Sequence, residues 1–270
     1  HHFHGWNDYM VPGSGGVSGG IPSETLDTVI VIPDTDVGIV EQTLENDDGI
    51  AAVIVEATGG HMGTYPIDAA FLHQIREVTK KHEVIFILDE VVTGFRVSTG
   101  GAQYRYGVTP DLTTMAKILA GGLPGGAVAG RADIINMIET KDDPEYNKYR
   151  RVGHNGTFNA NPVTMRAGEV VMNALTPDVY EAMNNLGEKL RNQLRAVFDE
   201  LEVDAQVTGV GSLFGIHFTQ DSIRNYRDVV NADSDMKRAF FVGMLNEGIL
   251  LQSGAAGALN VFSDENHVNQ

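Results

Sequence analysis

Short apolar runs alternate with segments of helical spacing along the first two thirds of the chain. Apolar residues that recur at helical spacing predict a helix over residues 68–83, and a further helix start follows at 132–138. Runs typical of buried strands are 28–33, 49–57, 84–91, 111–119 and 125–131. This alternation predicts an α/β fold with a mostly parallel central sheet flanked by helices.

The pattern changes near residue 175. A long amphipathic helix is predicted over 178–201, followed by strand-like segments within 207–218. A helix over 236–248 and a strand over 249–252 complete the chain. We therefore expect a large domain over 1–175 and a smaller C-terminal α+β lobe over 176–270.

Composition narrows the classes of partner. The 270 residues are 42% hydrophobic, which is enough for a large core, and 19 basic against 36 acidic residues give a net charge of −17. Such acidity argues against a nucleic-acid backbone or an anionic membrane as partner. The chain has no cysteine, so disulfides, thiol catalysis and Cys-ligated zinc are excluded.

The first residues and the apolar run lengths bear on location. No apolar run is as long as a membrane span, and HHFHGWNDYM does not have the pattern of a signal peptide. We therefore predict a cytoplasmic protein. The chain opens without a methionine and without a strand or helix of its own, so we also expect an upstream portion to be missing.

Two carboxylates end the strand predicted over 84–91. An unpaired carboxylate at the end of an apolar strand is costly, so Asp89 needs a cationic partner. That partner is either structural, with Arg96 or a helix N-terminus in the role, or the protonated ring nitrogen of a ligand. Strand alternation points Glu90 to the opposite face, so at most one of the two lines a given pocket.

A lysine stands at the end of the next predicted strand. Lys117 lies in a short apolar run, four residues before the loop GGLPGG (121–126). One interpretation is an ordinary surface lysine at an exposed helix start. The other follows from the expected sheet, because chemistry gathers at the carboxyl ends of parallel strands, where Asp89 and Lys117 would both lie.

Four motifs carry a family resemblance. They are FHGWND (3–8), VIVEATGGHMG (53–63), the long block ILDEVVTGFRVSTGGAQYRYGVTPDLTTMAKILAGGLPGGAVAGR (87–131), and GTFNANP (156–162). The chain resembles the class III, fold type I aminotransferases that depend on pyridoxal phosphate, especially the glutamate-1-semialdehyde aminomutase branch and its transaminase relatives. The resemblance covers nearly the whole chain. It implies pyridoxal 5'-phosphate as cofactor, amine or amino acid and keto acid substrates, and a homodimer.

The resemblance implies roles for residues around the cofactor. Lys117 corresponds to the lysine that forms the Schiff base and then moves the proton, and Asp89 to the partner of the pyridine nitrogen. Val91 would pack against one side of the ring. Phe3 stands where the family usually has an aromatic residue, often tyrosine, on the other side, with His4 beside it.

The motif GTFNANP implies a contribution from a second subunit. Thr157 aligns with the phosphate-binding threonine that the family donates across its dimer interface, so each site would need the partner. The segment also reads as a turn followed by a helix start at Asn161-Pro162, and both interpretations can hold. The family's other phosphate contacts would precede residue 1.

Other polar residues have weaker signals. Glu56 closes the strand over 49–57, where either a substrate-pocket role or a structural hydrogen bond is open, and His61 and Met62 are candidates for substrate contact. The histidines at positions 1, 2 and 4 sit in a context that matches the family, so we predict no metal. The segment GSGGVSGG (13–20) is interpreted as a mobile active-site loop rather than a nucleotide-binding turn.

Two departures favour one member of the family. The chain lacks the longer gating loop of the aminomutases within residues 12–33, and it has HNGTFNANP (154–162) in place of the usual AGTLSGNP. We therefore predict an aminotransferase that acts on an amine or amino acid, with a β- or ω-amino group as one option. The alternatives are glutamate-1-semialdehyde 2,1-aminomutase, a cofactor-free binding relic of the fold, and a racemase or decarboxylase that shares the fold, the cofactor and the lysine.

Overall fold

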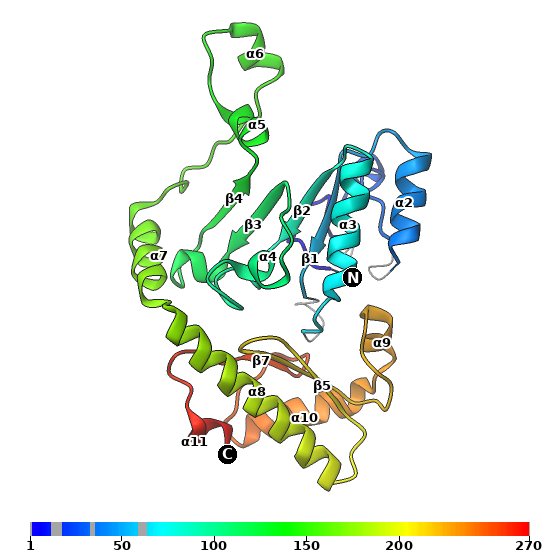
Figure 1. Cartoon of the computed structure of the whole chain (residues 1–270), viewed down its shortest axis with the longest axis vertical. Helices are drawn as coiled ribbons and strands as arrows, with labels where there is room; N and C mark the ends of the chain where they lie inside the picture. Colours follow the sequence, from blue (N-terminus) through cyan, green and yellow to red (C-terminus); the bar gives the residue numbers. More distant parts are fainter. Residues whose placement is uncertain (1, 12–17, 33–35, 59–63, 270) are drawn as a thin grey trace.

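Two β-sheets organise the chain (Figure 1). A computed structural model describes residues 2–11, 18–32, 36–58 and 64–269. The first sheet has the order β1-β2-β3-β4, and the second has the order β5-β6-β7. The strands are β1 (Ala52–Glu56), β2 (Ile85–Asp89), β3 (Leu112–Ala116), β4 (Gly126–Gly130), β5 (Gln206–Thr208), β6 (Leu213–His217) and β7 (Ala256–Ala258).

Helices and 3₁₀ turns connect these strands. The longer helices are α2 (Val37–Asn46), α3 (Ala69–Lys81), α7 (Pro162–Ala174), α8 (Pro177–Glu200) and α10 (Ser234–Asn246). The shorter ones are α1 (Ser23–Leu26), α4 (Gly101–Tyr106), α5 (Ala132–Ile135), α6 (Pro144–Tyr149), α9 (Tyr226–Asn231), α11 (Glu265–Val268), η2 (Lys117–Ala120) and η3 (Asn136–Ile138). Within the described residues, no helix combines the length and apolar character needed to cross a bilayer.

The first sheet is mostly parallel, as the sequence predicts. Strands β1, β2 and β3 run parallel, and β4 returns antiparallel beside β3. The register places Glu56 opposite Asp89 and Asp89 opposite Thr114, so the carboxyl ends of the three parallel strands lie at one edge. Buried Phe86 and Leu88 of β2 belong to the main core. The sheet therefore gathers its strand-end residues in one place.

The strand predicted over 28–33 is wrong for residues 28–32, which form turn and irregular structure; residue 33 lies outside the described residues. A cavity of about 440 Å³ lies between this segment and β1, lined by residues 29–32 and 53–55 among others. Ile30 and Val31 remain half exposed. The apolar run is present, but no strand of the described chain pairs with it, and a strand needs such a partner for its backbone.

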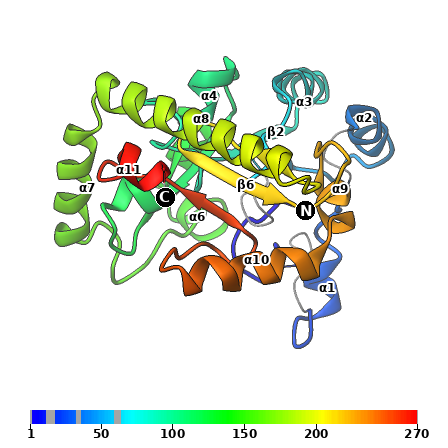
Figure 2. The same cartoon turned by 90° about the horizontal axis from the view of Figure 1, so that it is seen from below.

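The second sheet contains one strand that sequence patterning misplaces. Within the predicted strand 249–252, only Gln252 makes a β-bridge, to Ala256, and β7 forms the third strand instead. Helices α8 and α10, both predicted, run along this sheet (Figure 2). Their Phe198 and Phe240 rings contact Phe218 in a small apolar core. The domain boundary near residue 175, just before α8, stays a prediction.

Candidate active site

Lys117 stands at a sharp turn after β3. The strand predicted over 111–119 ends at Ala116, because Lys117 has a φ of +50° and starts the 3₁₀ turn η2. A non-glycine residue seldom adopts this left-handed conformation, and such strain is found at functional sites. Gly121 ends the turn with φ +62°, and a Cβ there would lie 2.4 Å from the carbonyl carbon of Ala167 in α7. The close packing of η2 on α7 therefore requires glycine at this position.

Desolvation and a neighbouring arginine favour the neutral form of Lys117. Although solvent reaches the side chain, neighbouring protein atoms partly desolvate the amine and lower the pKa of Lys117. The positive charge of Arg96 lowers it further, whereas Glu56 and Asp89 act in the opposite direction. A neutral amine is the nucleophilic form of lysine. Lys117 is exposed, as the surface-lysine interpretation expects, but its backbone and charge environment are not ordinary.

Asp89 is a buried carboxylate with two hydrogen-bond donors. His4 Nδ1 lies 2.7 Å from Asp89 Oδ2, and the Val91 amide donates to Asp89 Oδ1 at 3.0 Å. Burial would raise the pKa of Asp89, but the His4 hydrogen bond and the Val91 amide outweigh it and hold this pKa below its ordinary value. Its structural partner is thus His4, while Arg96 Nε donates to the Val92 carbonyl.

Glu90 has a separate structural role on the other side of the strand. Its carboxylate accepts from Thr93 Oγ1 at 2.8 Å and from the amides of Ala102 at 2.6 Å and Gln103 at 3.1 Å. It therefore binds the first turn of α4, where backbone amides lack helical partners. The two neighbouring carboxylates have different surroundings, as strand alternation predicts.

Glu56 is the second buried carboxyl group at the same sheet edge as Asp89. Its Oε2 accepts from the Phe3 amide at 2.8 Å, and its own amide donates to His2 Nδ1 at 3.0 Å. Burial raises the pKa of Glu56 to about 8; the Phe3 amide opposes this shift, and the charge of Asp89 adds to it. Glu56 therefore carries a proton for most of the time at neutral pH.

The structure brings together most of the predicted cofactor residues. Phe3, His4 and Asp89 are linked through the contacts above, and Val91 follows, half-buried, two residues after Asp89. Lys117 follows β3, whose Thr114 lies opposite Asp89, and the charges of Glu56 and Asp89 act on its amine. Arg96 is the residue whose electrostatic effect the sequence did not indicate, because no motif separates it from a structural arginine.

Three predicted residues are not placed at this edge. Thr157 lies in an exposed turn before α7, and no hydrogen bond of the described residues joins it to Lys117 or Asp89. Asn161 caps α7 with Pro162 in its first turn, which confirms the predicted helix start. The candidates His61 and Met62 fall outside the described residues.

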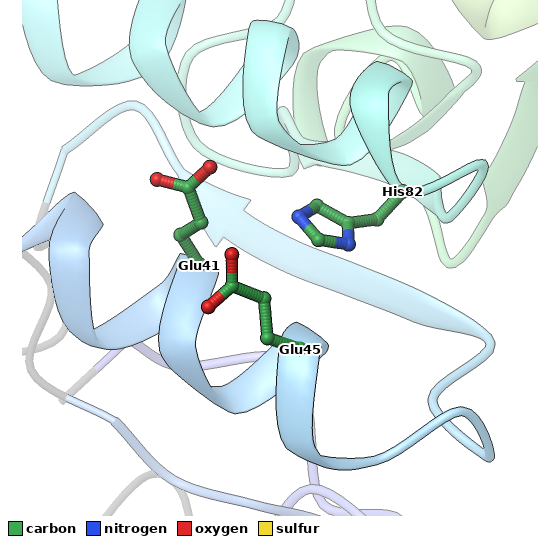
Figure 3. Close-up of side chains that lie close together, drawn as sticks. All are labelled: Glu41, Glu45 and His82. Carbon is green, nitrogen blue, oxygen red and sulfur yellow. The ribbon is translucent and has the colours of Figure 1, made fainter.

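A separate cluster of possible metal ligands lies on α2 and at the end of α3. Figure 3 shows Glu41 and Glu45 facing His82, with one ligand atom of each within 4.8 Å of the others. Lys81 Nζ already binds Glu41 and lies 3.9 Å from Glu45. One ammonium group thus already pairs with the carboxylates of this cluster, and no hydrogen bond or ion pair of the described residues joins the cluster to Lys117.

Comparison with known proteins decides the family. The aminotransferase class-III family model matches residues 34–262, which include β1 to β4 and both Asp89 and Lys117. The chain belongs to the class III aminotransferase family. The fold type I architecture expected from the family resemblance is confirmed by solved structures of high similarity.

Three relatives show how this class III chain compares. It is 36% identical over 256 residues to a glutamate-1-semialdehyde 2,1-aminomutase of Methanothermobacter thermautotrophicus, covering 92% of this chain and 59% of the relative. An omega-transaminase from Sphaerobacter thermophilus is 35% identical with a TM-score of 0.89, covering 99% of this chain and 64% of that one. A transaminase with PLP bound is 28% identical with a TM-score of 0.85, over 99% and 62%. The class III chain thus spans about three fifths of the length of these relatives.

Proposed function

We propose that the protein is an aminotransferase that depends on pyridoxal phosphate. It would move an amino group from an amine or amino acid, including β- or ω-amino compounds, to a keto acid or aldehyde. The observation that carries this proposal is that one sheet edge holds both Lys117, whose pKa is lowered, and Asp89, a buried carboxylate whose pKa is also lowered. Similarity to an omega-transaminase and to a transaminase with PLP bound supports it.

The residues at the sheet edge fit the cofactor chemically. Both oxygens of Asp89 already accept one hydrogen bond, but each carboxylate oxygen has two lone pairs and can accept another from a protonated ring nitrogen. Phe3 offers an aromatic face and Val91 an apolar one. When bound, pyridoxal phosphate supplies an electron sink for charge that develops on the substrate carbon.

Lys117 would serve as the attachment point and the proton carrier. Its Nζ is nucleophilic when neutral, and the lowered pKa increases that fraction near neutral pH. A neutral Nζ would also accept a proton from the substrate carbon. The resulting ammonium would then donate this proton to the atom that receives it in the next step. Lys117 is exposed, so a small substrate can approach Nζ.

The choice between aminotransferase and aminomutase rests on sequence rather than on the catalytic groups. The same Lys117 and Asp89 serve both reactions, since an aminomutase keeps the intermediate that an aminotransferase releases. The missing gating loop favours aminotransferase, whereas 36% identity to an aminomutase keeps the second reaction as the alternative.

An absorption experiment tests the proposed reaction. Protein loaded with pyridoxal phosphate should show a visible band that bleaches when an ω- or β-amino donor is added and returns when pyruvate is supplied. Recovery that needs the added keto acid identifies an aminotransferase, because an aminomutase completes its turnover with one substrate. A protein that takes up no pyridoxal phosphate would overturn the proposal in favour of the cofactor-free relic.

We also propose that the active unit is a homodimer in which Thr157 serves the partner's site. The turn and helix around Thr157 present large apolar side chains to solvent, with Phe158 81%, Val163 65% and Met165 52% exposed. Such a surface is typical of a protein–protein interface. A twofold dimer would cover the same surface on both subunits.

Mixing two variants of lowered activity tests whether Thr157 serves the partner's site. Lys117→Ala and Thr157→Ala are each expected to lower activity, but a heterodimer of the two has one site with both residues intact. We therefore expect activity to return on mixing and subunit exchange, toward about half that of the wild type per heterodimer. If Thr157 acts within its own subunit, every site of the heterodimer carries one mutation and mixing restores nothing.

A further inference from the structure

Three consecutive residues bind two adjacent strand ends. His2 Nδ1 accepts from the Glu56 amide at 3.0 Å, the Phe3 amide donates to Glu56 Oε2 at 2.8 Å, and His4 Nδ1 lies 2.7 Å from Asp89 Oδ2. Glu56 and Asp89 face each other in the parallel register of β1 and β2. The segment from residue 2 to residue 4 is thus fixed across the carboxyl edge of the sheet, with Glu56 making two of the three contacts.

We propose that Glu56 is a positioning residue that holds Phe3 and His4 in place beside Asp89. The side chain of Glu56 is buried, at 4% exposure, and one of its oxygens is already engaged by the Phe3 amide. Among the described residues, Asp89 is the residue of β1 and β2 to which His4 hydrogen-bonds, so the approach of His4 depends on where Phe3 is held. We call the hydrogen bond from the Phe3 amide to Glu56 the tether. Its role in cofactor binding rests on the proposed function, whereas the hydrogen bond itself does not.

This role differs from a contact with substrate. A carboxylate that binds a substrate amine should be ionised and accessible, but Glu56 is buried and its pKa is raised to about 8, so the carboxyl is mostly neutral at pH 7. A neutral carboxyl group has nearly the shape of a glutamine amide, and both accept a hydrogen bond from a backbone N–H through one oxygen. Glutamine should therefore replace Glu56 in the tether, and alanine should not.

Trp6 provides a direct readout because it is the single tryptophan of the chain. It lies on the edge of the Phe3 ring, with 5.6 Å between ring centroids, and is 71% exposed. In the full chain without cofactor, Glu56→Ala should lower the fluorescence anisotropy of Trp6, because the Phe3 amide is released, and should raise its acrylamide quenching only slightly, because Trp6 is already exposed. Glu56→Gln should restore both values toward the wild type.

Glu90→Ala is the matched control, since it removes a buried carboxyl group next to Asp89 that binds α4 rather than residues 2–4. It should lower thermal stability without changing Trp6. If Glu56→Ala leaves Trp6 unchanged, or if Glu56→Gln behaves like Glu56→Ala, the tether is wrong. This result is independent of any activity.

A measurement of cofactor affinity tests whether the tether matters for the proposed function. Glu56→Ala should bind pyridoxal phosphate on the order of tenfold more weakly than wild type, the loss expected for one buried hydrogen bond, and Glu56→Gln should recover most of it. A changed Trp6 signal with unchanged cofactor affinity would overturn the positioning role. Failure of the wild type to bind the cofactor would instead count against the proposed function and leave the tether standing.

Discussion

Lys117→Ala is expected to lower transamination by about 10³-fold or more, because one side chain supplies both the covalent attachment and the proton transfer. Borohydride reduction of the wild type in the presence of pyridoxal phosphate, followed by peptide mass spectrometry, should find the pyridoxyl group on the peptide that contains Lys117. The variant should lack this adduct and the visible band of the wild type. Lys117→Arg should behave in the same way, since it keeps the charge but has no reactive amine.

Lys81→Ala is the matched control for Lys117. Lys81 is an exposed lysine at the end of α3 that pairs with Glu41, so its loss should leave the adduct, the band and the rate unchanged. The free energy of unfolding of Lys81→Ala should also differ little from that of the wild type, because exposed ion pairs contribute little to stability. Labelling of Lys81 in the wild type, or normal turnover by Lys117→Ala, would contradict the assignment of Lys117.

The strands that carry the site were predictable because their signals are local. The runs that became β1 and β2 are apolar and short, and β3 is a short segment between Asp111 and Lys117, so these strands and their ends are predictable from the sequence. Asp89 lies at the end of such a run, and its placement followed from the parallel sheet. The turn at Lys117 did not, because an apolar run gives no sign that its last residue adopts a φ of +50°.

Contacts between distant segments could not be predicted from local sequence patterns. His4 and Asp89 are 85 residues apart, and Phe3 and Glu56 are 53 apart, so neither pair leaves a spacing pattern. The segment 28–33 shows that composition alone does not make a strand. Its residues are typical of a strand, but pairing depends on a neighbour elsewhere in the chain. The raised pKa of Glu56 likewise follows from burial, which strand patterning alone did not establish.

Asp89→Asn is expected to lower transamination by roughly 10²-fold or more, because asparagine keeps the shape of the side chain but cannot hold a ring nitrogen protonated. The folded state keeps the pKa of Asp89 below its ordinary value of 3.8, so the ionised carboxylate contributes stability above that pH which is lost as pH falls through the folded-state pKa. The variant should therefore be less stable than the wild type at neutral pH, with a flatter loss of stability in acid. Thermal unfolding from pH 7 down to values well below 3.8 measures both.

Asp111→Asn separates stability from catalysis. Asp111 is also a buried aspartate, bound by Arg76 at 2.6 Å and Arg131 at 3.1 Å on the opposite end of the same sheet from the strand-end site, at the start of β3. Its substitution should destabilise the fold but leave the cofactor spectrum and the response to donor unchanged. If Asp89→Asn loses only as much activity as Asp111→Asn, Asp89 is a structural group and the partner of the ring nitrogen has to be sought elsewhere. If the loss is confined to Asp89→Asn, Asp89 acts on the cofactor rather than through the stability of the fold.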